Sequence, residues 1–439
     1  MSRPPETSRT AVLADLSRRA GRLSDTTVIE ITGLLDRGGV DPAAVGGREI
    51  LRARIRVLKP ARFLTHCRLF CVPFEMLLSE ASASADPLRP VDRSAILPMW
   101  EAVEPALPPA VLEATAATLA DARSIRDEGL RAVAPDLWAA GAQVVDEAFD
   151  RIAARIDDPG WLVAIRAALA AHREILALRM VLAYGGRPAP DDALAGEIVR
   201  AVRAAAAQGP DEGYVAAVTA ALHFAAPAVV LEALANGGFA DGAARAGERV
   251  VLERFAAAVC ADTERELALL ARFDPATAAA DAAEAVESVA AAVHGLRAVS
   301  PRLRDAGLRK RLAAIEPRFR ATLADAVLPV TADRVLRRID DAVGQMLDGS
   351  DMADAVAIEA DMIALRRMRA GAEAVALGAE VDGRIAALLA QMERRAAQVV
   401  DGEGAGARRR RVLVLVRYVE QLAGPATAVR CMQRWLPAA

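Results

Sequence analysis

Aromatic side chains are scarce in this chain. Phe, Tyr and Trp together make up 4% of its 439 residues, whereas apolar residues as a whole make up 54%. Sheets favour aromatic and β-branched side chains, while Ala, which dominates the apolar set here, has the highest helix propensity. The composition therefore predicts an all-α protein, either a multi-helix bundle or a helical array with a small N-terminal helical module. The length exceeds that of one ordinary core.

Cysteine and histidine are equally rare, with four of each. Four unevenly spaced Cys do not form a disulfide framework, and the first residues, MSRPPETSRT, contain no apolar run suited to a signal peptide. Both observations favour the cytoplasm. Lysine is scarcer still, because Lys59 and Lys310 are the only Lys among the 55 basic residues. This excess of Arg is typical of a GC-rich bacterial genome.

The sequence also lacks the motifs that carry chemistry. It contains no Gly-x-Ser-x-Gly elbow, no phosphate loop, and none of the Glu-x-x-His pairs that a di-iron helical bundle needs. His66, Cys67 and Cys71 lie close together, but a structural zinc site normally needs four ligands, and the two Cys fall on an apolar helical face. We therefore expect no catalytic residue, no metal and no cofactor, and we favour a protein that is not an enzyme.

Charge is distributed unevenly around a net value of −3. Residues 1–78 contain 13 basic and 8 acidic side chains, and residues 402–439 contain 7 basic and 2 acidic ones, so both ends are basic and the middle is acidic. The basic ends either fold onto the acidic middle or attract an anionic partner. The first explanation is favoured, because a dedicated nucleic-acid binder is usually basic overall.

Proline and glycine divide the chain into four parts. Six Pro fall between Pro87 and Pro109, which predicts a proline-rich linker. The parts are a basic helical module over 1–80, the linker over 81–109, an acidic Ala-rich helical body over 110–400, and a Gly/Arg linker with a C-terminal helix over 401–439. If the body forms two subdomains, the division is expected near 237–243.

Helical periodicity is regular along the body. Pro135 and Pro159 are expected in the first turns of helices. Further helices are predicted near 190–208, 211–235, 243–272, 276–298, 302–327, 331–347, 352–377, 380–400 and 409–436. In the last of these, Val412, Leu415, Val416 and Val419 form an apolar stripe that is expected to pack on the body.

The segment 52–78 concentrates uncommon residues and is the best candidate for a contact surface. No acidic residue lies between Glu49 and Glu75, whereas basic and aromatic residues are frequent. The candidate binding residues are Arg52, Arg56, Lys59, Arg62, Phe63, Phe70 and Phe74. Three interpretations stay open: the Phe residues form a core beside ordinary surface Arg, the segment docks a protein, or it binds anionic lipid or nucleic acid.

The leading functional hypothesis is a non-catalytic cytoplasmic helical interaction or scaffold protein that docks a protein partner through segment 52–78. The first alternative is a peripheral membrane or polyanion-binding protein that uses the same Arg cluster. The second alternative is a helical enzyme or small-ligand binder with buried carboxylates facing a cavity. The sequence does not define the oligomeric state.

Overall fold

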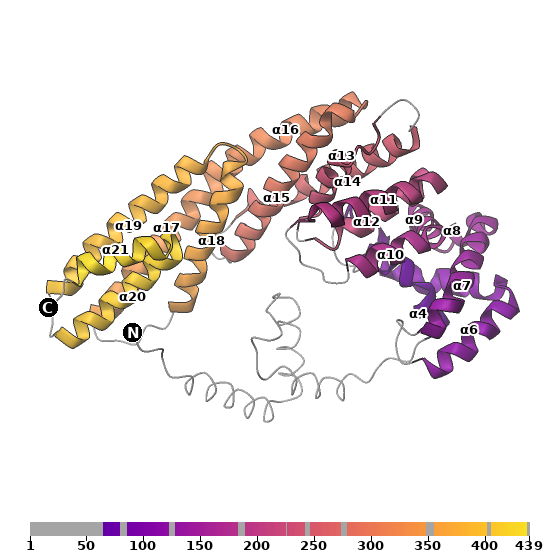
Figure 1. The fold of residues 1–439 in the computed structure, drawn as a ribbon, viewed down its shortest axis with the longest axis horizontal. Coiled ribbons are helices and arrows are strands. Elements are labelled where there is room, and N and C mark those ends of the chain that lie inside the picture. The colour runs from indigo at the N-terminus through magenta and orange to yellow at the C-terminus, as the bar shows by residue number, and fades with distance from the viewer. Residues whose placement is uncertain are drawn as a thin grey trace. The chain divides into compact units, whose positions relative to one another are not determined.

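The structure is a computed structural model that describes residues 65–79, 86–122, 128–182, 189–224, 226–241, 246–273, 279–347, 355–401 and 405–436. Within these ranges it contains 18 α-helices and two strands of two residues each (Figure 1). Most helices pack against helices that follow or precede them closely in the chain. The prediction of an all-α helical array is confirmed.

The first elements are short. They are α4 (His66–Phe70), the 3₁₀ helix η2 (Val72–Leu77), β1 (Leu78–Ser79), β2 (Val91–Asp92), η3 (Arg93–Ala95), α5 (Ile96–Val103), η4 (Glu104–Ala106), α6 (Pro109–Asp121), α7 (Glu128–Glu147) and α8 (Phe149–Ala153). The two strands pair in parallel, with Leu78 opposite Val91 and Ser79 opposite Asp92.

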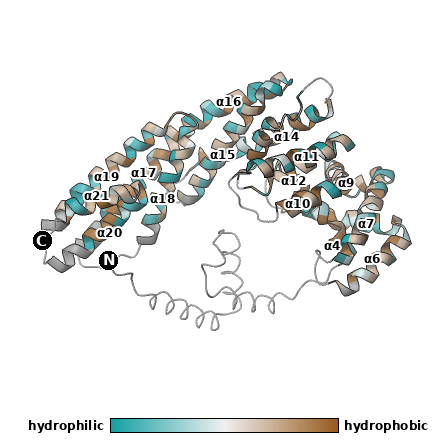
Figure 2. Cartoon of the chain, viewed as in Figure 1, coloured by the Kyte–Doolittle hydropathy of each residue, from teal (hydrophilic) through white to brown (hydrophobic). Residues whose placement is uncertain are grey.

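The following elements are mostly longer helices. They are α9 (Gly160–Ala170), α10 (His172–Val181), α11 (Asp192–Gln208), α12 (Pro210–Ala221), α13 (Val229–Asn236), α14 (Ala246–Leu270), α15 (Ala279–Val299), η5 (Ser300–Arg302), α16 (Ala306–Thr322), the π-helix η6 (Leu323–Val327), α17 (Leu328–Leu347), α18 (Ala355–Glu373), α19 (Gly378–Asp401), α20 (Ala405–Ala423) and α21 (Pro425–Trp435). Apolar and polar residues alternate along these helices (Figure 2).

Contacts divide the chain into two compact units. The first comprises residues 1–70 and 109–134, and the second comprises residues 71–108 and 135–439. In the first unit α4 packs against α6, and His66 Nε2 lies 3.1 Å from the carbonyl oxygen of Leu112. In the second unit η2 packs against α9, α10 and α12, and the later helices follow as an array through α14, α15, α18 and α20.

Residues 86–108, predicted as part of a linker, are instead folded into the second unit. They form β2, η3, α5 and η4, and they bury Val91, Met99 and Val103 completely. The prolines fit helical starts here, because an N–H group in the first turn has no partner within its helix. Pro105 is the second residue of η4, and Pro109 is the first residue of α6. Proline in this segment therefore marks the starts of helices rather than a flexible linker.

Two other predictions from proline need correction. Pro135 lies inside α7 rather than in its first turn, whereas Pro159 is the residue that caps the start of α9. The helix predicted over 211–235 is divided into α12 and α13, and Pro227 lies between them. A proline inside a helix removes one backbone hydrogen bond, and the structure tolerates that loss at Pro135 but not at Pro227.

Small residues allow the helices of the second unit to approach closely. A Cβ atom at Gly295 of α15 would lie 2.5 Å from the carbonyl oxygen of Ala228, which immediately precedes α13. A Cβ atom at Gly371 of α18 would lie 2.6 Å from Cγ1 of Val286 on α15. Both distances are shorter than non-bonded carbon contacts allow, so these two crossings require glycine.

Arginine–carboxylate pairs join helices that are distant in the sequence. Arg367 of α18 binds Glu287 of α15 through two hydrogen bonds, of 2.5 and 2.9 Å. Arg417 of α20 binds Glu359 of α18 in the same two-bond manner. These two pairs therefore join α18 to α15 and to α20. The C-terminal stripe also packs as predicted at Val412, Leu415 and Val419, which are fully buried.

Two histidines of the second unit each contact a backbone carbonyl of the preceding helix through Nδ1. The Nδ1 atom of His172 lies 2.7 Å from the carbonyl oxygen of Leu169, and that of His223 lies 2.8 Å from the carbonyl oxygen of Thr219. A carbonyl accepts, so Nδ1–H donates and the neutral ring keeps Nε2 unprotonated. His172 is 6% exposed, and its Nε2 atom has no hydrogen-bond partner within the described part of the chain. Burial lowers the pKa of both histidines.

Replacement of His172 by Asn should reduce the loss of stability in acid. Because the folded-state pKa of His172 is lowered, the unfolded chain binds a proton first, and the free energy of unfolding falls as the pH drops below about 6.5. Asn keeps an N–H donor for the Leu169 carbonyl and does not titrate. Urea denaturation between pH 7.5 and 5 should show a smaller slope for the variant. An unchanged slope would contradict the buried neutral state of His172.

Replacement of Phe74 by Ala should lower the free energy of unfolding by about 3–5 kcal/mol, because the side chain is fully buried and its removal leaves a cavity. Leu97→Ala is the matched control, since Leu97 is 62% exposed, and it should change stability by less than about 0.5 kcal/mol. Denaturant titration measures both. A Phe74 variant as stable as the Leu97 variant would show that Phe74 is not part of the core.

Candidate functional site

The structure gives two of the seven predicted binding residues a definite place. Arg52, Arg56, Lys59, Arg62 and Phe63 lie outside the described residues. Phe70 and Phe74 are both fully buried, so neither side chain is presented on a surface in this structure. For these two positions the structure agrees with the alternative interpretation, in which the aromatic residues form a core.

The end of the predicted segment is held in the second unit by an arginine that the sequence did not single out. Arg179 of α10 donates one hydrogen bond of 2.5 Å to the carbonyl oxygen of Val72 and lies 3.2 Å from the carboxylate of Glu75. Leu77, the last residue of η2, is fully buried, as is Phe74 in the same helix. This part of the segment therefore serves as an anchor.

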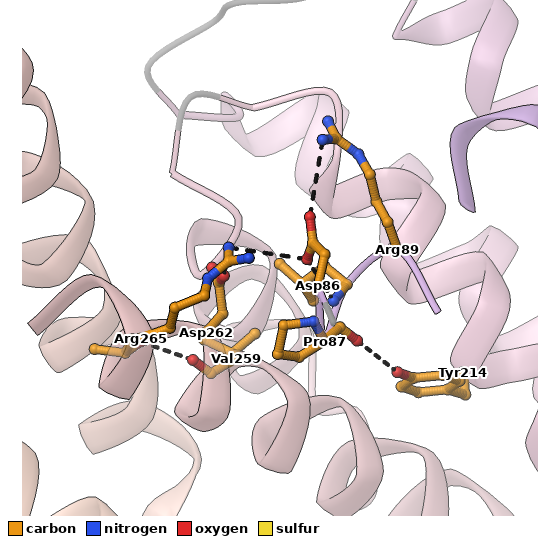
Figure 3. Close-up of polar contacts among 9 residues, drawn as sticks. Asp86, Pro87, Arg89, Tyr214, Val259, Asp262 and Arg265 are labelled. Atoms are coloured by element: carbon orange, nitrogen blue, oxygen red, sulfur yellow. Dashed lines mark hydrogen bonds and ion pairs between the residues drawn. The ribbon is translucent and has the colours of Figure 1, made fainter. Parts of the chain in front are cut away.

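A cluster of charged residues lies elsewhere in the second unit. We call it the acid–arginine cluster, and it consists of Asp86 and Arg89 in the turn before β2 and Asp262, Arg265 and Glu266 on α14 (Figure 3 shows all but Glu266). Positions 262, 265 and 266 fall on one helical face, because residues three and four apart are neighbours on a helix. The turn and α14 are far apart in the sequence, and the fold brings them together.

Arg265 is the link between the turn and the helix. Its guanidinium forms an ion pair with Asp262 and lies 3.9 Å from Oδ1 of Asp86. Arg89 Nη1 lies 3.8 Å from the other carboxylate oxygen of Asp86. Asp86 also accepts a hydrogen bond of 2.9 Å from the backbone N–H of Leu88, which gives the turn its shape. The turn is therefore attached to α14 mainly through one shared guanidinium.

A second polar contact attaches the same turn to α12. The hydroxyl of Tyr214 donates to the carbonyl oxygen of Pro87 at 3.5 Å (Figure 3). The guanidinium of Arg254 lies over the Tyr214 ring at 4.7 Å from its centroid. Burial raises the pKa of Tyr214, so the hydroxyl remains a donor at neutral pH.

Burial and like charges make the two acids of α14 reluctant to ionise. The pKa of Asp262 is raised by burial and further by the neighbouring charge of Asp86, although Arg265 opposes both effects. The pKa of Glu266 is raised to about 7 by burial first and then by the charges of Asp262 and Glu284, while a hydrogen bond from Ser288 opposes the shift. Glu266 therefore exchanges a proton near neutral pH.

Two cavities are found among the described residues of the second unit, and the acid–arginine cluster lines neither of them. A cavity of about 440 Å³ is lined by Ala106 and by residues of α7 and α8, including Asp146, Glu147 and Asp150. A smaller one of about 100 Å³ lies between α15 and α16. Asp262, which is buried, and Glu266, which is partly buried, therefore face neither of the two spaces that could hold a substrate.

One local feature of the sequence points to this cluster, although the sequence analysis did not single it out. Asp262 and Glu266 are like charges four residues apart on a strongly predicted helix, a spacing that destabilises a helix unless tertiary contacts compensate. The partner residue Asp86 carried no comparable signal, since it lies in the segment that was expected to be a linker.

Comparisons with known proteins do not assign this chain to a family. No protein-family model, no curated protein and no solved structure matches the chain. In the described ranges no group of three or more His, Cys, Asp or Glu side chains could hold a metal ion. Among the helices of those ranges, none has a stretch long and apolar enough to span a bilayer.

Replacement of Glu266 by Gln should stabilise the protein above pH 7. The ordinary pKa of Glu is 4.5 and the folded-state value is about 7, so stability present below pH 4.5 is lost as the pH rises to 7. Gln removes this loss, and the free energy of unfolding at pH 8 should exceed the wild-type value by about 2 kcal/mol. Urea denaturation at pH 5 and 8 measures the difference. Equal pH dependence of the two proteins would contradict the raised pKa of Glu266.

Proposed function

We propose that this protein is a non-catalytic helical interaction protein that docks a protein partner through the basic residues of segment 52–78. The observation that carries the proposal is the burial of Phe74 in η2, which packs against α9, α10 and α12. This end of the segment is anchored in the second unit, and a segment anchored at one end loses less conformational entropy on binding than one that is free at both ends.

The partner that this arrangement favours is acidic. With Phe70 and Phe74 buried, recognition falls mainly to Arg52, Arg56 and Lys59, together with Arg62. Guanidinium groups bind carboxylates in a planar, two-bond geometry, as Arg367 and Arg417 do within this structure. A protein surface or helix rich in Asp and Glu is therefore the partner we propose, and the complex should weaken as salt is added.

The membrane alternative loses support from the same observation. An interfacial helix needs apolar side chains that can enter the lipid, and Phe70 and Phe74 are buried within the protein. The compartment we propose is the cytoplasm of a bacterium with a GC-rich genome. The small number and uneven spacing of the Cys residues and the excess of Arg support this assignment.

Reversal of the four basic charges should abolish partner binding. The variant carries Glu at Arg52, Arg56, Lys59 and Arg62, and partner recovery from native lysate should fall at least about tenfold, because each lost charge pair weakens the interface. A control variant carries Glu at four other basic positions that are exposed: Arg309, Lys310, Arg320 and Arg430. It changes the net charge equally. Circular dichroism should confirm equal helicity of all three proteins.

The control separates a local contact from a general effect of charge. A partner retained by the wild type and the control but lost by the segment variant supports docking through the segment. Equal loss in both variants indicates attraction by net charge, and equal retention contradicts the proposal. Vesicles containing phosphatidylserine and duplex DNA are tested in parallel. Binding to either that only the segment variant loses would favour the polyanion-binding alternative.

A further inference from the structure

Two stretches of the second unit carry charge of a single sign. Residues 96–108, which form α5 and η4, and residues 135–150, which form most of α7 and the start of α8, contain no basic residue. Their acidic residues are all exposed, and they are Glu101, Glu104, Asp136, Asp146, Glu147 and Asp150. Asp146 lies 3.5 Å from Arg166, whereas none of the other five forms an ion pair with a described residue.

The fold brings these two stretches together around one cavity. Ala106, which ends η4, lines the cavity of about 440 Å³ together with Glu147 and Asp150. Arg151 also lines it, so acidic side chains outnumber basic ones there. In addition, α5 packs against α8. We call the surface formed by α5, η4 and the acidic residues of this cavity the acidic face.

The acidic face fits a partner that offers cations beside aliphatic side chains. Carboxylates without an ion-pair partner attract guanidinium and ammonium groups, and the cavity has room for such a group. Leu97 is 62% exposed and lies four residues from Glu101 on α5, so both side chains point to the same side of the helix. An exposed Leu beside carboxylates favours a basic segment that also carries apolar residues over a small cation.

The chain itself contains a segment with this chemistry. Residues 52–62, RARIRVLKPAR, include five basic residues and no acidic one, and Ile55, Val57 and Leu58 lie between the basic positions. The segment and the acidic face are therefore complementary in charge, and both contain apolar side chains. Two copies related by a two-fold axis make this contact twice, once from each copy, and the assembly is closed.

We propose that the acidic face binds residues 52–62 of a second copy of this chain, in a reciprocal two-fold dimer. The proposal rests on the proposed function, because it takes residues 52–62 as the docking segment and names the acidic surface that the segment binds. Leu97 contacts the aliphatic residues of the segment, and the carboxylates around the cavity pair with its Arg and Lys side chains. Because the contact depends mainly on exposed charges, the dimer dissociates as salt is added.

Sedimentation equilibrium of the full chain tests the dimer. At about 50 mM salt the wild type should approach twice the monomer mass, and its dissociation constant should rise at least about tenfold at about 500 mM salt. A segment variant carries Glu at Arg52, Arg56, Lys59 and Arg62. A face variant carries Lys at Glu101, Glu104, Glu147 and Asp150. Either variant alone should dimerise at least about tenfold more weakly than the wild type, because like charges then meet at the contact.

A mixture of the two variants and a matched control assign the contact to these residues. An equimolar mixture of the segment variant and the face variant should dimerise again, since the Glu-bearing segment then meets the Lys-bearing face and the native segment meets the native face. The control carries Lys at four other exposed acidic positions, Glu232, Asp325, Asp333 and Glu420. It changes the net charge as the face variant does and should dimerise like the wild type. Circular dichroism should show equal helicity of all proteins.

Loss of the dimer in both variants, its recovery in their mixture and its retention in the control support the proposal. A wild type that stays monomeric, a face variant that dimerises like the wild type, or a control that loses the dimer overturns it.

The proposed function can stand when this inference fails. A monomeric wild type that recovers a lysate protein, which only the segment variant loses, overturns the dimer and supports docking of a different acidic partner. A segment variant that dimerises like the wild type and also retains the lysate protein overturns both.

Discussion

The close approach of helices at glycine is the constraint on which the array depends. At Gly295 and Gly371 the backbone of one helix meets atoms of another at distances that leave no room for a Cβ atom. The narrow space between such closely packed helices can be filled by Ala, Val and Leu. The scarcity of aromatic residues is therefore consistent with a dense core. A larger side chain at either crossing would push apart helices that contact several neighbours.

A core of small residues has a consequence for charge. Each Ala buries little apolar area, so the array gains less from the hydrophobic effect per residue than a Leu- or Phe-rich bundle would. Arginine–carboxylate pairs between helices add specific contacts, as at Arg367 with Glu287. Where such pairs are buried, loss of one partner leaves an uncompensated charge. Asp361, which is 5% exposed and bound by Arg334 and Arg338, is the clearest case.

The same principle distinguishes the acid–arginine cluster from the other ion pairs. Asp361 has two arginines for one carboxylate, so its charge is fully compensated despite the burial that raises its pKa. The acid–arginine cluster has three acids for two arginines, and burial and the neighbouring carboxylates raise the pKa of both Asp262 and Glu266. Ion pairs such as those of Asp361 and Glu287 thus join neighbouring helices of the array.

The sequence alone determined the helical class and most helix positions, because propensity and apolar period are local properties that each segment carries by itself. The helices predicted near 190–208, 243–272 and 380–400 correspond to α11, α14 and α19. Proline was ambiguous, since Pro105 and Pro109 suit the start of a helix as well as a linker. The burial of Phe70 and Phe74 and the meeting of Asp86 with Arg265 were decided by tertiary structure. Both depend on which distant segments pack together, and no local pattern of residues specifies that.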